Sequence, residues 1–395
     1  MGKTKREPSH QDAFYRHYAA VWGEERWSNS LYPALAQPTR YSLLINRALP
    51  ESAVTHVLET AGTPIEDLES IPLPALRGVV VKDRPLCLAK RTDEVSSEAA
   101  ASPSFPQPQL ARDSTTGSQS LTHWNMDAAS VLAARLLDVK AGDAVLDLCA
   151  APGGKSITLA QDLFFGNPKP TPGACSGMDS YNSAFLCCNE AEKTRFRRLS
   201  ENVSAYLPRT LNVKCTNIDA TSPNAHRELA TPGGWDKVLV DAPCSSERHI
   251  IHSQIKAQAA GRVAPEMANW RPGSTRRLQE MQVKLLMTAL RLLKDNGQVL
   301  YATCSVEVGE NDGVIEKMRA QIDKERKKGL VNWDVRIDDL NTPDTGNVSE
   351  PLADFLEREW LERTKHGWIV LPDHPRGGRW GPLFFTRLSK VYSER

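Results

Sequence analysis

Hydrophobic and polar residues follow two different patterns along the chain. In the first ninety residues, four apolar side chains recur at the spacing of one helix face: Phe14, Tyr18, Val21 and Trp22. A second short helix is predicted over residues 41–49, whereas the β-branched run that ends residues 71–81 favours a strand. We therefore expect residues 1–90 to form a mainly helical accessory module.

Beyond residue 126 the pattern changes to buried strands that alternate with helices. Strands are predicted over residues 144–148, 175–179, 211–215, 237–241 and 298–302. Helices are predicted over residues 126–137, 182–206, 276–293 and 313–328, and another directly after Gly153 and Gly154. Residues 368–371 and 383–388 are expected to pair as a terminal antiparallel hairpin. This alternation favours an α/β fold with a doubly wound, mostly parallel sheet over residues 121–395.

Three stretches break this regularity. Residues 91–120 are rich in Ser, Ala, Pro and Thr, which is typical of a flexible linker or a surface insertion. Residues 252–274 and 340–350 are predicted to be long polar loops. We expect the loop over 252–274 to be an element that selects the substrate.

Composition and charge exclude several classes of protein. Charged residues make up 25% of the 395-residue chain, hydrophobic residues make up 40%, and the net charge is +1, so any basic surface is local. No apolar run approaches the roughly 20 residues that span a bilayer, which argues against a membrane protein. The basic start of the chain has no apolar segment after it, and Glu7 and Asp12 disfavour a transit peptide. The 8 cysteines are expected to be reduced, and none has the spacing of a zinc ligand, so no metal is expected.

Acidic residues stand at the ends of the predicted strands. Asp147 ends the first strand, Asp179 the second and Asp241 the fourth, while Asp219 follows the third. Each alone is explained by a turn or a helix cap. Four acids at the carboxyl edge of one sheet favour a site for hydroxyl groups, an amine or a cationic ligand, because ligands of such sheets bind at that edge.

A glycine turn follows the first predicted strand. Residues 148–156 end in Gly-Lys-Ser like a phosphate-binding loop, but Cys149 stands where that loop needs its first glycine. What remains is a turn at which the backbone approaches a ligand beside a helix N-terminus, with Lys155 as a partner for a carboxylate. An ordinary strand-to-helix turn is an almost equally good interpretation of this segment alone.

Two cysteines leave predicted strands at the same edge. Cys244 follows the fourth strand and Cys304 the fifth, so both thiols are expected to face one crevice. A thiolate is a strong nucleophile, whereas a free cysteine is commonly a small buried hydrophobe. We assign the second role to Cys87, Cys175, Cys187, Cys188 and Cys215.

Methylation of carbon 5 of cytosine would use this arrangement. Carbon 5 becomes nucleophilic only after a thiolate adds to carbon 6, and an acid at the ring nitrogen stabilises the developing charge. The carbon 5 proton must then leave before the thiol is expelled. Asp241, Cys304 and Cys244 supply one acid, one nucleophile and one group that assists release.

Three motifs in this order resemble the NSUN (Sun-domain, Fmu-like) family of RNA cytosine-C5 methyltransferases. They are DLCAAPGGK at 147–155, DAPCS at 241–245 and TCS at 303–305. The resemblance covers about residues 124–318 and implies a Rossmann-like class I fold that uses S-adenosylmethionine. By the family pattern the cofactor is held by Cys149, Ala150, Ala151, Pro152, Gly153, Gly154 and Lys155, by Asp179 at its ribose, by Asp219 near its adenine, and by Asp241.

The same resemblance assigns the two thiols. Cys304 of the TCS motif is implied to be the nucleophile and Cys244 of DAPCS the release cysteine. DNA cytosine methyltransferases instead use the cysteine after the fourth strand, so the presence of Thr-Cys after the fifth strand favours the RNA family.

Upstream residues are similar to the subgroup that lacks a PUA domain. Residues 14–27, 41–46 and 124–130 carry this similarity. The subgroup is mitochondrial and acts on rRNA or on a tRNA anticodon, and we favour rRNA. The stretches at 91–120 and after His249 depart from the pattern, as does the absence of a clear transit peptide, so cytoplasm or nucleus stays an alternative. A protein partner that delivers the RNA is left open.

A basic surface is needed because the target cytosine must leave its stack. Candidates are Arg195, Arg197, Arg198, Arg248, His249, Arg271, Arg276 and Arg277, with Trp270 as a stacking platform. Taken singly, each is better explained as a solvated surface side chain. The alternative functions are a catalytically idle RNA-binding or ribosome-assembly factor and a small-molecule methyltransferase, and the second leaves both cysteines unexplained.

Overall fold

A nine-stranded mixed sheet forms the centre of the part of the chain that the computed structural model describes. That part comprises residues 10–73, 86–90, 105–113, 117–166, 184–340, 352–376 and 378–392. In spatial order the strands are β13 (Glu362–Arg363), β14 (Trp368–Val370), β15 (Leu383–Tyr392), β11 (Leu293–Thr303), β10 (Trp235–Asp241), β7 (Ala144–Asp147), β8 (Phe185–Asn189) and β9 (Val213–Thr216), and β12 (Trp333–Ile337) pairs with β15. The strands from β11 to β9 run parallel, and β15 joins antiparallel. The order confirms the predicted doubly wound sheet with an antiparallel terminal hairpin.

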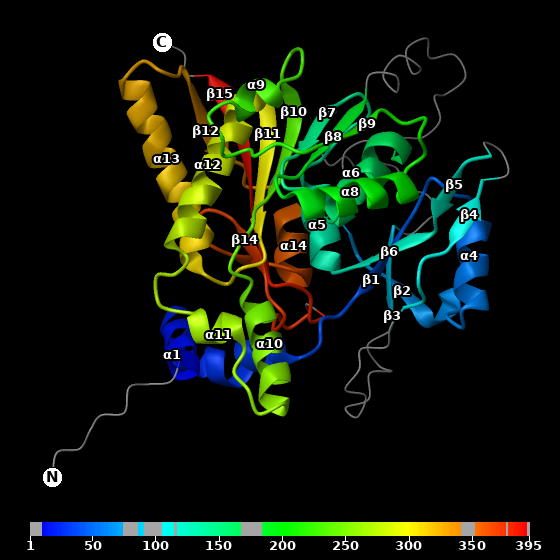
Figure 1. Cartoon of the computed structure of the whole chain (residues 1–395), viewed down its shortest axis with the longest axis horizontal. Helices are drawn as coiled ribbons and strands as arrows, with labels where there is room; N and C mark the ends of the chain where they lie inside the picture. The colour runs from blue at the N-terminus through cyan, green and yellow to red at the C-terminus, as the bar shows by residue number, and fades with distance from the viewer. Residues whose placement is uncertain are drawn as a thin grey trace.

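Helices cover both faces of this sheet (Figure 1). One group is α5 (Ala128–Leu136), α6 (Gly154–Phe165) and α8 (Lys193–Tyr206); the other includes α12 (Arg276–Leu292) and α13 (Asp312–Lys327). Alternate residues of β10 show the two faces: Leu239 belongs to the core under the first group, and Val238 and Val240 to the core under the second. Side chains of a strand alternate between faces, so an apolar run such as this one is buried on both.

A second, four-stranded sheet stands beside the first and corrects one prediction. Its order is β2 (Leu68–Ser70), β3 (Cys87–Lys90), β1 (Ser42–Ile45) and β6 (His123–Met126). Residues 42–45, predicted as helix, form β1, and all four are buried. A short apolar run fits a helix or a strand equally well, and here pairing with β3 and β6 on its two sides decides for the strand.

The remaining N-terminal elements are helices and one hairpin. They are α1 (His10–Trp22), α2 (Glu24–Arg26), η1 (Trp27–Leu31), α3 (Tyr32–Ala36), α4 (Glu51–Thr60) and η2 (Ile65–Asp67), followed by the hairpin β4 (Leu110–Arg112) and β5 (Gln119–Leu121). The helix predicted from Phe14 to Trp22 is confirmed as α1. The hairpin falls within the predicted linker, and most of the strand predicted over 71–81 lies outside the described residues. The domain boundaries at 90 and 120 stay a prediction.

The second strand of the parallel sheet was predicted at the wrong place. The predicted strand over 175–179 lies outside the described residues, and the predicted helix over 182–206 is wrong in its first part. Residues 185–189 form β8 between β7 and β9, and α8 begins only at Lys193. The run Phe185-Leu186-Cys187-Cys188 is apolar without interruption, which is the pattern of a strand covered on both faces.

The predicted polar loop over 252–274 is largely helical. It contains the end of α10 (Glu247–Ala259) and all of α11 (Pro265–Asn269), which lie against α1 at the lower edge of the molecule (Figure 1). Trp270 is only 5% exposed and packs edge-on against Phe14 at a centroid distance of 5.2 Å. The prediction that Trp270 stacks on a base is therefore wrong, because the N-terminal helix covers its ring.

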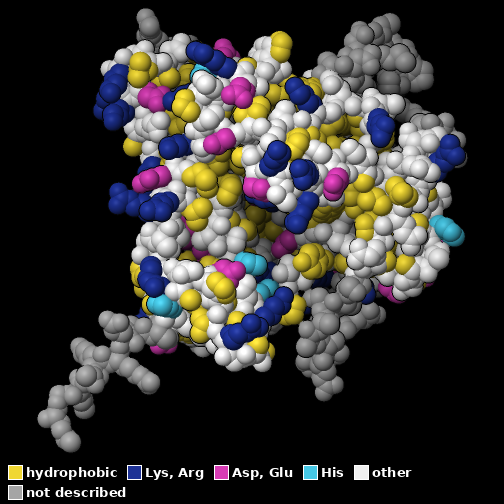
Figure 2. All heavy atoms as spheres, in the orientation of Figure 1, with side chains coloured by type: hydrophobic (Ala, Val, Ile, Leu, Met, Phe, Trp, Pro, Cys, Tyr) yellow, Lys and Arg dark blue, Asp and Glu magenta, His cyan; other side chains and the backbone are white. Residues whose placement is uncertain are grey.

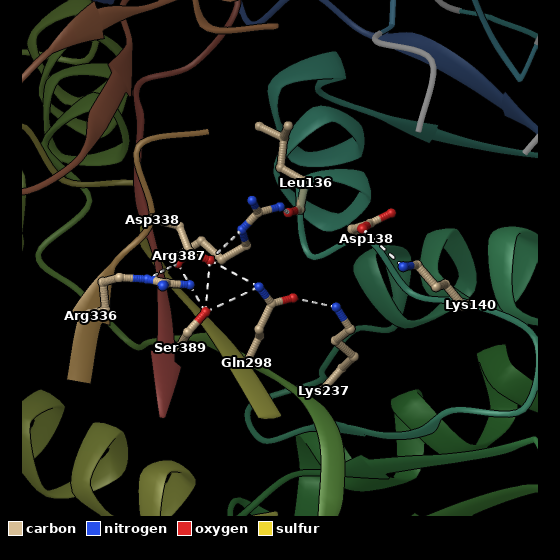
Figure 3. Close-up of polar contacts among 9 residues, drawn as sticks. All are labelled: Leu136, Asp138, Lys140, Lys237, Gln298, Arg336, Asp338, Arg387 and Ser389. Atoms are coloured by element: carbon tan, nitrogen blue, oxygen red, sulfur yellow. Dashed lines mark hydrogen bonds and ion pairs between the residues drawn. The ribbon is translucent and has the colours of Figure 1, made fainter. Parts of the chain in front are cut away.

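A buried polar network fixes the terminal strands to the sheet (Figure 3). Asp338 accepts hydrogen bonds from Arg387 Nε at 3.0 Å and from Ser389 Oγ, and Gln298 joins them through its Nε2. Lys237 donates to Gln298 Oε1, and burial lowers the pKa of Lys237 to about 8. The network joins β10, β11, β12 and β15 at the end of the sheet away from the carboxyl ends of the parallel strands.

Within the described ranges, no helix is long and apolar enough to cross a membrane. The same residues contain no cluster of three side chains suited to hold a metal ion.

Candidate active site

The turn between β7 and α6 brings backbone close to other groups at the carboxyl edge of the sheet. Gly153 has a φ of +119°, a conformation that only glycine adopts readily. A Cβ on Gly154 would lie 2.9 Å from Trp124 Nε1. Ala150 N donates to Asn189 O at 2.7 Å, which fixes the turn to the end of β8. Both glycines are thus required by the turn, as the sequence indicated.

Lys155 and Asp241 form the ion pair at the centre of this edge. Lys155 Nζ lies 2.7 Å from Asp241 Oδ2, at the start of α6 and the end of β10 respectively. Burial would lower the pKa of Lys155, but the Asp241 carboxylate raises it above its ordinary value. The sequence predicts that Lys155 binds a carboxylate of a ligand. In the structure, Lys155 binds the carboxylate of Asp241.

Asp147 lies behind the turn and is 1% exposed. Ser156 Oγ donates to its Oδ2 at 2.6 Å. Burial raises the pKa of Asp147 to about 7, although the Ser156 hydrogen bond acts in the opposite direction. Asp147 therefore supports the turn from inside the fold.

The acid at the end of the second strand is Glu190. The predicted Asp179 lies outside the described residues, whereas Glu190 directly follows β8 and is 4% exposed. Its Oε1 accepts from Glu192 N at 2.9 Å, while the buried Oε2 has no hydrogen-bond donor and lies 3.4 Å from Arg195 Nη1. Sequence reasoning missed Glu190, although the apolar run before it is a stronger strand signal than residues 175–179.

Asp219 is exposed and lies in the segment that follows β9. Its Oδ1 accepts from Thr221 N at 2.9 Å and from Thr221 Oγ1 at 2.7 Å. Asp219 thus stabilises a local turn at the same edge of the sheet, on the side of β9.

The structure brings the two predicted cysteines together. Cys244 and Cys304 follow β10 and β11, which are parallel neighbours, and their Sγ atoms lie 3.1 Å apart. Ser246 Oγ lies 3.0 Å from Cys304 Sγ. Ser246 has a φ of +54°, an uncommon value for a residue with a side chain and one that persists only where the surroundings enforce it. Cys304 is exposed and Cys244 is partly buried.

The contact between the thiols makes them unequal. A hydrogen bond from Cys244 lowers the pKa of Cys304, with a further contribution from Ser246. The same hydrogen bond raises the pKa of Cys244. The arrangement favours a thiolate at Cys304 and a thiol at Cys244, which is the division expected of a nucleophile and a proton-carrying neighbour.

A cavity of about 480 Å³ opens in front of Cys304. Lys155, Asp241 and Cys304 line one part, and Tyr41, Arg248 and residues 381–383 are among those that line the rest. Its volume lies in the range of roughly 300–1,000 Å³ that is usual for sites of small molecules. The nucleophile and the acid of the sequence prediction therefore face one cavity, and Glu190 and Asp219 are not in its lining.

The predicted basic residues divide into buried and exposed ones. Arg248 is only 7% exposed and donates to backbone oxygens of Gly381, Gln37 and Pro38, so it is not a free surface cation. The first part of α8 is different, because four basic side chains are exposed there: Lys193, Arg195, Arg197 and Arg198. Figure 2 shows Lys and Arg side chains gathered over this region, beside the hollowed centre of the face.

Comparison with known proteins agrees with the motifs. Residues 175–339 match the model of a family described as 16S rRNA methyltransferase RsmB/F. The mitochondrial tRNA (cytosine(34)-C(5))-methyltransferase of Mus musculus is 30% identical over 275 residues, 69% of this chain and 65% of that protein. The 5-cytosine rRNA methyltransferase NSUN4 of Xenopus tropicalis is 30% identical over 278 residues, 69% of this chain and 57% of that protein. The chain thus spans less than two thirds of the length of either relative.

Solved structures share the fold. NSun6 from Pyrococcus horikoshii, crystallised with SFG, has a TM-score of 0.57 at 16% identity, with 96% of this chain and 98% of that chain covered. A methyltransferase homologue from the same organism has a TM-score of 0.55 at 20% identity, with 96% and 94% covered. The strand order, the motif resemblance and the family match agree: the described sheet has the Rossmann-like class I fold, and residues 175–339 are similar to the RsmB/F methyltransferase family.

Proposed function

We propose that this protein is an S-adenosylmethionine-dependent methyltransferase that acts on carbon 5 of a cytosine in RNA. The observation that carries the proposal is the pair of thiols 3.1 Å apart, Cys304 and Cys244, with Cys304 facing the same cavity as Asp241. A methyltransferase for oxygen or nitrogen needs no nucleophile of its own. A thiolate beside a second thiol and a carboxylate fits a ring carbon that must be activated covalently.

The residues at the β7–α6 turn fit the cofactor. The glycine turn lies at the N-terminus of α6, where backbone N–H groups can face a ligand, and Glu190 Oε2, which receives no hydrogen bond and lies 3.4 Å from Arg195 Nη1, is a buried acceptor suited to ribose hydroxyls. We assign the ribose to Glu190 in place of Asp179, and keep Asp219 on the adenine side. When bound, the cofactor supplies an electrophilic methyl group.

The chemistry of the chain's own residues then follows in order. The Cys304 thiolate adds to carbon 6, and the electron pair of the carbon 5–carbon 6 double bond moves into the ring while Asp241 contacts the ring nitrogen. Carbon 5 takes the methyl group, whose bond to the cofactor sulfur would break and leave its electron pair on that sulfur, and carbon 5 then loses its proton to water. The electrons of that C–H bond restore the double bond, and the bond from carbon 6 to Cys304 breaks. Cys244 assists this release as the neighbouring thiol.

RNA is the substrate that the exposed cations of α8 suit best. Lys193, Arg197 and Arg198 lie on the helix that follows Glu190, so a phosphate backbone bound there passes close to the cofactor edge. We favour rRNA over tRNA, as in the name of the Xenopus tropicalis relative, whereas the Mus musculus relative is named for a tRNA. We favour a mitochondrial location, as in the name of the Mus musculus relative. A protein partner that delivers the RNA is compatible with this assignment.

The competing function is a catalytically idle RNA-binding or ribosome-assembly factor on the same fold. The purified protein is incubated with S-adenosylmethionine and with transcripts of rRNA or tRNA, and the RNA is digested and analysed for 5-methylcytidine. We expect 5-methylcytidine with the wild type and none with Cys304→Ala. Binding of RNA without binding of S-adenosylmethionine would support the idle factor.

A further inference from the structure

The N-terminal helix α1 contacts the segment that directly follows the nucleophile. Trp22 Nε1 donates to Val306 O at 3.1 Å, and His17 Nε2 lies 2.7 Å from Glu307 Oε2. Val306 and Glu307 are the second and third residues after Cys304. Two side chains of α1 therefore contact the segment after the nucleophile, Trp22 at its backbone and His17 at a side chain.

A third contact passes through Glu247, the first residue of α10. Tyr18 Oη donates to Glu247 Oε1 at 2.9 Å, and both side chains are fully buried. Val306 N donates to the other oxygen, Oε2, at 2.9 Å, and Ser245 Oγ donates to Oε1. One carboxylate thus binds the loop of Cys244 through Ser245, the loop of Cys304 through Val306, and α1 through Tyr18.

The two cysteine loops also contact each other from the side of the sheet. Ser245 Oγ lies 3.0 Å from Ser305 Oγ, and Ser245 N donates to Glu310 Oε2 at 3.1 Å. These contacts hold the two loops against each other. The Glu247 carboxylate adds hydrogen bonds to both loops, and its orientation depends on the position of α1 because Tyr18 donates to it.

A purely structural role would not need this carboxylate. Packing of Phe14 and Tyr18 against Trp270 already holds α1 in place. A fully buried carboxylate is costly unless its oxygens receive hydrogen bonds, and apolar side chains of similar size would stabilise the contact at least as well. A carboxylate that accepts from three donors fixes the positions of Tyr18, Ser245 and Val306 relative to one another.

We infer that α1 is a positioning element of the catalytic site, and that Tyr18 and Glu247 hold the Cys304 thiol at its distance from Cys244. This inference rests on the proposed function, because the position of the Cys304 thiol affects catalysis only if Cys304 is the nucleophile. Tyr18, His17 and Glu247 are positioning residues, since each acts on Cys304 through the segment after it.

The test compares Tyr18→Phe with Tyr15→Phe in the full chain. Tyr15 lies on the same helix, but its hydroxyl donates at 2.7 Å to Ser28 Oγ, which belongs to neither cysteine loop. His17→Gln is the second variant, because its partly exposed ion pair is removed without a cavity in the core. The measurements are kcat and KM for RNA methylation, the melting temperature, and the rate at which iodoacetamide alkylates Cys304 as a function of pH.

We expect Tyr18→Phe to lower kcat about tenfold, because a hydrogen bond to a charged group is lost, while KM for the cofactor changes less than about twofold. Alkylation of Cys304 at neutral pH should slow and its pH midpoint should rise. His17→Gln should change the same quantities in the same direction, and Tyr15→Phe should match the wild type.

Equal kcat and equal Cys304 alkylation in Tyr18→Phe, His17→Gln and Tyr15→Phe would overturn the inference, whatever happens to the melting temperature. The alkylation profile needs no RNA. If the wild type methylates no RNA but Tyr18→Phe still changes the Cys304 profile, the proposed function fails and the positioning of the thiol stands.

Discussion

The Sγ atoms of Cys304 and Cys244 lie 3.1 Å apart at the ends of two neighbouring parallel strands. Sixty residues separate them along the chain. Their closeness follows from the order of the sheet, because residues that leave adjacent parallel strands at the same level meet at one edge. The pair is the feature from which the proposed chemistry starts.

The first prediction concerns the reactivity of this pair. Cys244 lowers the pKa of Cys304 by a hydrogen bond, so Cys244→Ala should raise that pKa and shift the pH profile of Cys304 alkylation to higher pH. The rate for the modified Cys304 peptide is measured by mass spectrometry. Cys215→Ala, on β9, is the matched control and should leave the profile where it is. An unchanged profile in Cys244→Ala would show that the two thiols do not interact.

The second prediction distinguishes the two candidate ribose acids. Glu190→Gln should weaken binding of S-adenosylmethionine by about tenfold or more, because a charged acceptor for hydroxyl groups is lost. Asp179→Asn should bind the cofactor like the wild type. Isothermal titration calorimetry measures both. Weak binding by Asp179→Asn together with normal binding by Glu190→Gln would return the ribose to Asp179.

The difference between Glu190 and the predicted Asp179 also shows why part of the site could not be predicted. The motif turn, Asp241, Cys244 and Cys304 follow strands whose apolar runs are distinct in the sequence, and the structure places all of them at one edge. The second strand was missed because residues 185–188 extend directly into a helical pattern. Residues 185–189 are a strand because they pair with β7 and β9, and a single sequence does not contain that information.

Non-local contacts account for the other errors. Trp270 lies in a polar stretch and was expected at the surface, but Phe14, from the opposite end of the chain, covers it. Arg248 was expected to contact RNA, but backbone oxygens of Gln37 and Gly381 bind its guanidinium. In both cases the partner is an N-terminal or C-terminal segment whose position is set by the tertiary fold.

The third prediction is a pH dependence of stability from His17. The hydrogen bond to Glu307 raises the pKa of His17 above 6.5, so the ion pair stabilises the fold fully below the unfolded pKa. This contribution is lost as the pH rises through the raised, folded-state pKa. The wild type should therefore exceed His17→Gln in free energy of unfolding by about 1 kcal/mol at pH 6, and by less at pH 9.

Urea unfolding at each pH measures this difference. His226→Gln on α9 (Ala225–Glu228) is the control, because that histidine is exposed on a short surface helix. A difference between wild type and His17→Gln that stays constant from pH 6 to pH 9 would contradict the ion pair.

The fourth prediction is a pH dependence of stability from Asp147, whose pKa is raised mainly by burial. Burial raises its pKa to about 7, so the folded state keeps a proton that the unfolded state has already lost above about pH 4. The stability of the wild type should therefore fall as the pH rises from about 4 to about 7, by up to about 4 kcal/mol from this group. Asp147→Asn has no carboxyl group at this position, so its free energy of unfolding should rise relative to that of the wild type as the pH increases.

The comparison uses free energies of unfolding at pH 4, 5.5, 7 and 8. Asp323→Asn, an exposed residue of α13, serves as the control and should follow the wild type throughout. If Asp147→Asn also runs parallel to the wild type, the buried carboxyl does not carry a raised pKa.

In the proposed reaction, Cys304 attacks the cytosine and Cys244 assists its release. The most direct measurement incubates wild type, Cys304→Ala and Cys244→Ala with RNA and S-adenosylmethionine and detects protein–RNA adducts that survive a denaturing gel. We expect Cys244→Ala to accumulate a covalent adduct, because the bond from carbon 6 to Cys304 forms but breaks slowly, and Cys304→Ala to form none. An adduct with Cys304→Ala and none with Cys244→Ala would show that Cys244, and not Cys304, is the nucleophile.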